Sequence, residues 1–126
     1  MARRAVSTTK APRAIGAYSQ AISSDGLIFC SGQVALDSAT GELVGESVAD
    51  QTRRCMENLS AVLEAAGVGL ESVVKVNAYL TDMNDFAEFN EVYGEFFSDE
   101  PPARAAIGVA GLPKGARVEI ECIART

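Results

Sequence analysis

The sequence predicts an α+β fold in which two helices pack on one face of a mixed β-sheet. Three observations support this fold class. Segments that alternate like strands surround two segments with helical periodicity, in the order strands, helix, strand, helix, strands. The 126 residues are enough for one core, so we expect a single domain over residues 1–126. The 48% hydrophobic and 22% charged residues are ordinary for a globular protein.

The N-terminal part is predicted to form antiparallel strands joined by turns. These strands are expected at residues 3–8, 18–22 and 27–33. Asp25-Gly26 is a hairpin turn signal between the second and the third strand. The apolar run from Leu27 to Cys30 suits a buried strand. Residues 36–45 indicate a loop, because turn-forming residues recur in this segment.

The clearest element is a helix that begins after Ser47. Ser47 can cap its N-terminus, with the acidic Asp50 at the third helical position. Residues at spacings of three and four then share one face of the helix, namely Val48, Thr52, Cys55, Leu59, Val62 and Ala66. Gly67 fits the left-handed position just past the helix end. Cys55 is therefore interpreted as a small core residue.

The C-terminal half predicts three strands and a second helix. Strands are expected at residues 73–81, 103–110 and 117–124. Asp82 or Asn84 can cap a helix that runs to about Phe97 and packs its phenylalanines on the sheet, before Pro101-Pro102 ends it. One strand face is expected to carry Val74, Val76, Ala78 and Leu80 from the first strand, with Val118, Ile120, Cys122 and Ala124 from the last.

The opposite sheet face needs a separate explanation. It is expected to carry Val73, Tyr79 and Ile123 among charged residues. A single layer of helices cannot cover both faces, so we expect this half-polar face to meet a neighbouring subunit. The pattern alone gives no stoichiometry.

The composition excludes several kinds of chemistry. The chain has no histidine, which rules out a Ser-His-Asp triad, a Cys-His pair and a histidine-rich metal site. The three cysteines are scattered, so neither a disulfide framework nor a zinc site is expected, and a reducing, cytoplasmic location is favoured. No apolar run approaches the roughly 18 residues of a membrane span.

The net charge of −6 argues against nucleic acid as the main partner. Residues 1–13 differ from the rest, because they contain Arg3, Arg4, Lys10 and Arg13 and no acid. This segment is either an organelle transit peptide or a first strand with solvated charges. Its shortness favours the second interpretation.

Arg104 is the most informative single residue. It follows Pro102-Ala103 and opens an otherwise apolar strand. An arginine in such surroundings needs a partner, because an unpaired buried charge is costly. Its forked donors suit a carboxylate bound at two points. The alternatives are a structural ion pair with Glu119 or Glu121, or simple exposure.

Other candidates gather on strands and strand ends. Glu119 and Glu121 share one strand face, and a glutamate in a partly dry site can transfer protons near neutral pH; the alternative is a solvated or ion-paired face. Ser31-Gly32 offers a hydroxyl and accessible backbone groups at a strand end. Tyr18 either reaches into a site or packs in the core.

Several short motifs follow one another along nearly the whole chain. They are Ala11-Pro12, Ile15–Gln20, Ser31-Gly32-Gln33, Asp82–Phe86, Asn90, Tyr93, Phe96-Phe97, Pro102-Ala103-Arg104, Leu112-Pro113-Lys114 and Val118–Glu121. Each motif is modest, but their order and spacing are specific. In this combination the chain resembles the Rid family, the reactive intermediate deaminases, which are also called YjgF-type proteins.

The resemblance implies a chorismate-mutase-like fold and a homotrimer with sites in clefts between subunits. It also implies hydrolysis of 2-imino or enamine acids, such as 2-aminoacrylate and 2-iminobutyrate, to 2-keto acids and ammonia. These short-lived substrates leak from pyridoxal-phosphate enzymes such as serine and threonine dehydratases. The resemblance implies neither a metal nor an organic cofactor.

The resemblance also assigns roles to individual residues. Arg104 matches the arginine that binds the substrate carboxylate, and Glu119 the glutamate that positions or activates water. Gly32 would offer its carbonyl to the substrate nitrogen. Ala106 would contribute a backbone amide. The pocket would further be lined by Tyr18, Ser31 and Asn90.

Two positions depart from the family pattern. Ala17 stands where the family often has proline, which would loosen the loop that carries Tyr18. Ala106 replaces a cysteine, serine or threonine, so a polar or redox-sensitive side chain is lost there.

Three other functions stay open at this stage. They are a non-catalytic trimeric ligand-binding, regulatory or chaperone-like protein, an endoribonuclease or translation inhibitor, and a specialised deaminase for one aromatic or branched imine. Arg104 and Glu119 favour the enzyme, because a binding protein need not keep them. The acidic charge and the lack of histidine disfavour RNA cleavage.

Overall fold

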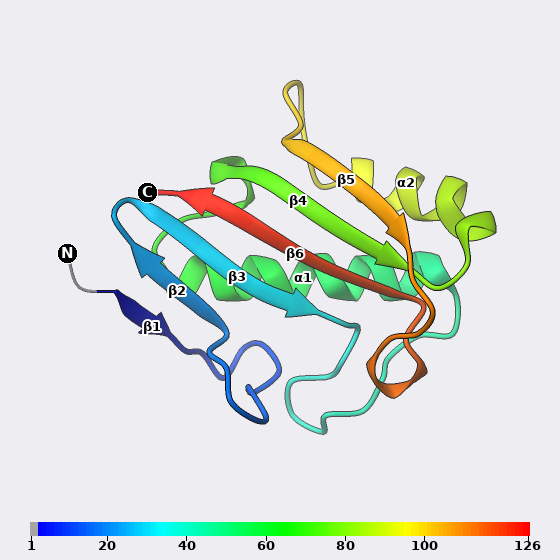
Figure 1. The fold of residues 1–126 in the computed structure, drawn as a ribbon, viewed down its shortest axis with the longest axis horizontal. Helices are drawn as coiled ribbons and strands as arrows, with labels where there is room; N and C mark the ends of the chain where they lie inside the picture. Colours follow the sequence, from blue (N-terminus) through cyan, green and yellow to red (C-terminus); the bar gives the residue numbers. More distant parts are fainter. Residues whose placement is uncertain (1–2) are drawn as a thin grey trace.

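The computed structural model describes residues 3–126, which form one six-stranded sheet and two α-helices (Figure 1). The strands are β1 (Arg4–Val6), β2 (Ala21–Ser24), β3 (Leu27–Gln33), β4 (Val73–Leu80), β5 (Ala103–Gly108) and β6 (Val118–Arg125). The α-helices are α1 (Val48–Ala65) and α2 (Phe86–Gly94), and short 3-10 helices lie at η1 (Leu70–Ser72), η2 (Met83–Asp85) and η3 (Pro113–Gly115). The basic segment 1–13 is therefore described only from residue 3 onward.

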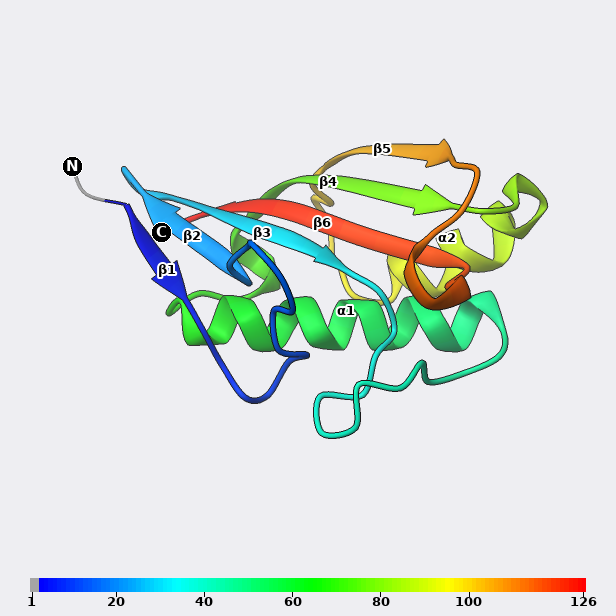
Figure 2. The ribbon, with the colours of Figure 1, turned by 60° about the horizontal axis from the view of Figure 1, so that its bottom comes forward.

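The sheet is mixed, with the strand order β1-β2-β3-β6-β4-β5. Only β4 and β5 are parallel, and η2 and α2 connect them. Both α-helices lie on one face of the sheet, and the other face is bare (Figure 2). The predicted α+β fold class is thus confirmed. We call the bare side the open face.

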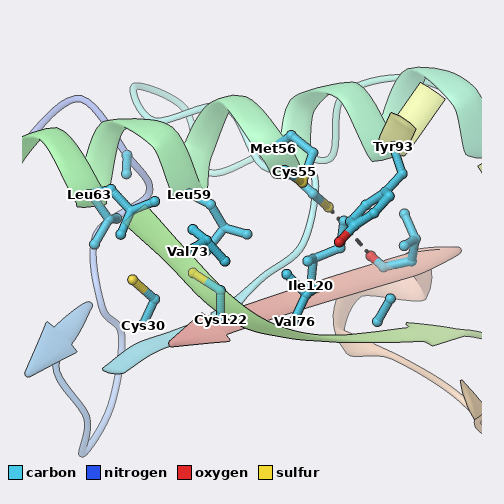
Figure 3. Packing of buried hydrophobic residues seen from close by; sticks show 14 of the residues in the cluster. Cys30, Cys55, Met56, Leu59, Leu63, Val73, Val76, Tyr93, Ile120 and Cys122 are labelled. Atoms are coloured by element: carbon cyan, nitrogen blue, oxygen red, sulfur yellow. Dashed lines mark hydrogen bonds between the residues drawn. The ribbon is translucent and has the colours of Figure 1, made fainter. Parts of the chain in front are cut away.

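The core lies between the helices and the covered face of the sheet. Ile28, Leu59, Val76 and Ile120 are almost completely buried there. All three cysteines are buried and free, and Figure 3 shows them in the core with Leu59, Val76 and Ile120. Their interpretation as core residues is confirmed.

Local signals in the sequence set several of the element ends. Asp25 and Gly26 both have left-handed backbone angles, with φ of 50° and 78°, as a two-residue type I′ hairpin requires. At the start of α1, the Ser47 hydroxyl accepts a hydrogen bond from the Asp50 N–H at 3.0 Å. Gly67 follows the helix with φ of 88°.

The predicted faces of β4 are wrong at its start. Val73 is buried on the core side, whereas Val74 is exposed on the open face. The pairing with β6 shifts between Val73 and Lys75, which marks a β-bulge. Because of the bulge, the side chains of Val73 and Val74 lie on the opposite faces from those that strict alternation predicts. From Val76 onward the predicted alternation holds.

Several predicted boundaries also change. The second strand begins at Ala21, and the side chain of Gln20 just before it donates to the carbonyls of Thr8, at 3.1 Å, and Pro12, at 2.7 Å. Asp82 caps η2, and the helix that follows ends at Gly94, before Phe97. The first strand covers only Arg4–Val6, and β5 ends at Gly108.

The apolar run in β3 is not buried throughout. Its side chains alternate across the sheet, so Ile28 and Cys30 face the core while Leu27 and Phe29 stand on the open face. None of the helices within residues 3–126 is long and apolar enough to cross a membrane.

Candidate active site

Arg104 lies on the edge strand β5 and points to the helix side of the sheet. It pairs in register with the buried Val76, so its side chain turns toward α2. The guanidinium carbon lies 4.8 Å from the centre of the Tyr93 ring, and the Phe86 and Phe89 rings lie at 5.5 and 5.8 Å. These aromatic faces stabilise the cation without neutralising it.

The contacts of Arg104 leave room for an anion. Its Nη1 donates to Oδ1 of the exposed Asn90 at 2.7 Å. Within residues 3–126 no carboxylate lies within 4.0 Å of the guanidinium, so the alternative of an ion pair with Glu119 or Glu121 is wrong. Both glutamates face the other side of the sheet. Arg104 also lines a cavity of about 370 Å³ between α2 and the Pro101-Pro102 turn.

Tyr93 forms the closest wall of this arginine site. Burial raises the pKa of Tyr93 to about 12, and the nearby Arg104 only partly opposes this effect. The phenol therefore stays neutral at physiological pH, and its ring can hold the guanidinium in place without contributing charge.

Glu119 lies on the open face, against the backbone of Gly32. A Cβ atom built on Gly32 would overlap Oε2 of Glu119, so a side chain at position 32 would displace the carboxylate. The contact occurs where the pairing of β3 with β6 breaks its register, between Cys30 and Gln33. The missing side chain of Gly32 thus leaves the space that the Glu119 carboxylate occupies.

The carboxylate of Glu119 is partly withdrawn from water. Burial, and then the negative charge of Glu121, raise its pKa above the ordinary value. None of the side-chain hydrogen bonds described for residues 3–126 involves the Glu119 carboxylate, so its oxygens are available to water or to a ligand. A glutamate of this kind can accept and return a proton closer to neutral pH than an exposed one.

Ser31 connects the glutamate region to the loop that carries Tyr18. Its hydroxyl donates to the Ser19 carbonyl at 2.6 Å, and its N–H donates to the Gln20 carbonyl at 2.9 Å. Tyr18 itself is 53% exposed, which excludes the core interpretation.

The candidate residues thus form two groups. The arginine group consists of Arg104, Asn90 and Ala106, which shares the helix-facing side of β5 with Arg104. The glutamate group consists of Ser31, Gly32 and Glu119. They lie on opposite faces of the sheet, so one chain does not bring Arg104 and Glu119 together. Among residues 3–126, no cluster of acidic and cysteine side chains is placed to hold a metal ion.

Comparison with known proteins identifies the family. The sequence matches the family described as Endoribonuclease L-PSP over residues 8–126, nearly the full chain. This chain belongs to the Rid family, also known as the YjgF or L-PSP family. The resemblance seen in the sequence motifs is thereby confirmed.

Members of the Rid family that resemble this chain differ in their names. The 2-iminobutanoate/2-iminopropanoate deaminase of Mus musculus is 51% identical over 97% of this chain and 90% of its own length. RidA from a Psychrobacter species has a TM-score of 0.94 at 46% identity, covering 98% of this chain and 99% of its own. Escherichia coli TdcF, solved with bound serine, has a TM-score of 0.93 at 40% identity, covering 98% of both chains.

Proposed function

We propose that this Rid family protein hydrolyses 2-imino and enamine acids, such as 2-iminobutyrate and 2-aminoacrylate, to 2-keto acids and ammonia. The observation that carries the proposal is Arg104, a partly buried cation held by aromatic rings and an amide with no carboxylate of its own. A substrate carboxylate would supply the missing charge. The name of the mouse relative and the serine bound to TdcF agree with a small substrate that has a carboxylate and a nitrogen.

The proposed mechanism needs orientation, a proton relay and water. Arg104 fixes the carboxylate, the Gly32 carbonyl receives the N–H of the substrate, and the Ala106 amide donates a further hydrogen bond. Glu119 takes a proton from a water molecule while the oxygen of that water attacks C2 of the substrate. It then returns the proton to the nitrogen, and ammonia leaves as the keto acid forms. No covalent nucleophile is required, because C2 is already electrophilic in the iminium form, which an enamine reaches by tautomerisation.

The separation of the two groups supports a site shared between copies of the chain. The open face exposes large apolar side chains, with Leu27 at 38%, Phe29 at 43%, Val74 at 41% and Ile107 at 48%. Another copy packed on this face would cover them and bring an arginine group to a glutamate group. We propose the homotrimer that the family resemblance implies, acting in the cytoplasm without a metal or an organic cofactor.

A coupled reaction tests the proposed activity. A threonine dehydratase generates 2-iminobutyrate in solution, and the purified protein should speed the appearance of 2-ketobutyrate and ammonia beyond the uncatalysed rate. An unchanged rate across a wide range of protein concentrations would refute the deaminase proposal. RNA incubated with the same preparation should stay intact, which tests the activity in the family description.

Gly32→Ala should lower the deaminase rate by about 10- to 100-fold, because the new Cβ displaces the Glu119 carboxylate from its position against the backbone. Gly111→Ala is the matched control. Gly111 is also a surface glycine, but a Cβ there meets nothing within 4 Å. Steady-state kinetics should show a loss for the first variant only, with unchanged circular dichroism for both. Equal activity of the two variants would contradict the role of this contact.

A further inference from the structure

A second carboxylate on the open face is held in a fixed position. Asn77 Nδ2 and the Tyr79 hydroxyl both donate to the same oxygen, Oε2 of Glu121, each at 3.1 Å. Burial and this hydrogen bond raise the pKa of Tyr79, so the phenol keeps the proton that it donates. All three side chains are half-buried.

The direction of the Tyr79 side chain is informative. In the pairing of β4 with β6, Tyr79 lies directly opposite Glu119, and Asn77 lies directly opposite Glu121. Tyr79 nevertheless gives its hydroxyl diagonally to Glu121 and leaves its direct neighbour without that donor. Asn77 and Tyr79 therefore hold the carboxylate of Glu121 in place, and neither of them donates to Glu119.

Few other charged or titratable groups face Glu119. On β6 the neighbour on the same face is Glu121, and across β4 it is Tyr79. On β3 the contact is the backbone of Gly32, which has no titratable group. Lys75 and Arg125 lie on this face nearer its other end, opposite and beyond Ile123. Glu121 is thus a charged neighbour of Glu119 whose side chain is held in place by hydrogen bonds.

We propose that Glu121, anchored by Asn77 and Tyr79, is a positioning residue that sets the protonation of Glu119 and leaves its carboxylate free for the water and proton steps. Same-face neighbours on a strand are about 7 Å apart, close enough for one charge to act on the other across a partly buried surface. The anchors hold that charge at a constant distance. This inference rests on the proposed function only for its kinetic consequence.

Glu121→Gln is the direct test, because it removes the charge and keeps the shape and an acceptor oxygen. Without the neighbouring negative charge, Glu119 ionises more easily and its pKa falls. In ¹³C NMR titrations of the glutamate carboxyls, assigned with Glu119→Gln, the Glu119 midpoint should move to lower pH. The acid limb of the pH profile of kcat/KM should move in the same direction, since Glu119 must be ionised to accept a proton.

Tyr79→Phe should give the opposite result. It removes one donor that offsets the Glu121 charge and keeps every charged group, so the Glu119 midpoint and the acid limb should move to higher pH. Glu64→Gln, the same chemical change on the exposed side of α1, should move neither. If Glu121 and Tyr79 had only a structural role, their variants would change the protein yield or the melting temperature, and the Glu119 midpoint would not move in opposite directions.

The outcomes separate the two proposals. Glu119 midpoints that are the same in the wild type and in Glu121→Gln overturn the positioning role, whether or not the protein is a deaminase. Opposed NMR movements in a protein without imine hydrolysis support the positioning role and overturn the proposed function instead.

Discussion

Arg104→Ala should lower kcat/KM for imine hydrolysis by about 10²- to 10³-fold, the range expected when a charged, two-point contact to a substrate carboxylate is lost. Residues 3–126 give Arg104 no carboxylate within 4.0 Å, and the surrounding rings and Asn90 already fix its direction. The loss should therefore affect the positioning of the substrate rather than the fold. Steady-state rates with enzymatically generated 2-iminobutyrate measure it.

Two further variants make this test specific. Arg104→Lys keeps the charge but not the forked geometry, so it should recover only part of the lost rate. The control is Arg53→Ala, which removes a different arginine. Unlike Arg104, Arg53 forms an ion pair, at 2.8 Å from Glu95, and it lies on the exposed side of α1. It should behave as the wild type. Wild-type kinetics in Arg104→Ala would remove this residue from the site.

Mixed assemblies of Arg104→Ala and Glu119→Gln chains should regain activity that neither variant has alone. The two groups lie on opposite faces of one chain, so each complete site would take its arginine from one copy and its glutamate from another. In trimers that contain both variants, one site of three takes both intact residues, so their rate should return to about a third of the wild-type rate.

The measurement uses two affinity tags. The two variants are co-expressed, and tandem purification isolates assemblies that contain both. The double variant Arg104→Ala/Glu119→Gln, co-expressed with itself, is the matched control and should stay inactive. If mixed assemblies were as inactive as the separate variants, the shared-site arrangement would be wrong.

Much of this fold could be predicted because local sequence determines it. The alternation in β6 places Glu119 and Glu121 together on one face whatever the neighbouring strands do. Asp25-Gly26 and Ser47 define a turn and a helix start through backbone chemistry of a few residues. The α1 face follows from spacing alone.

The remaining features depend on contacts between distant segments. The bulge at Val74 arises from pairing with β6, and nothing in the strand sequence marks it. The side of the sheet that Arg104 faces follows from its register with β4, which the apolar neighbours of Arg104 do not reveal. Asn77 and Tyr79 appear in the sequence only as polar strand positions, and their shared acceptor becomes visible in the structure.

Because the candidate site is divided between two faces of the sheet, a folded chain need not be an active one. A single chain can complete its core, its hairpin and both helices and still hold only half of the proposed site. Specific activity would then depend on total concentration, because dilution below the dissociation constant of the assembly would remove the activity while the spectrum and the core of each chain stayed native. A cell could therefore tune this activity through the amount of chain that it makes, and the response would be steeper than proportional.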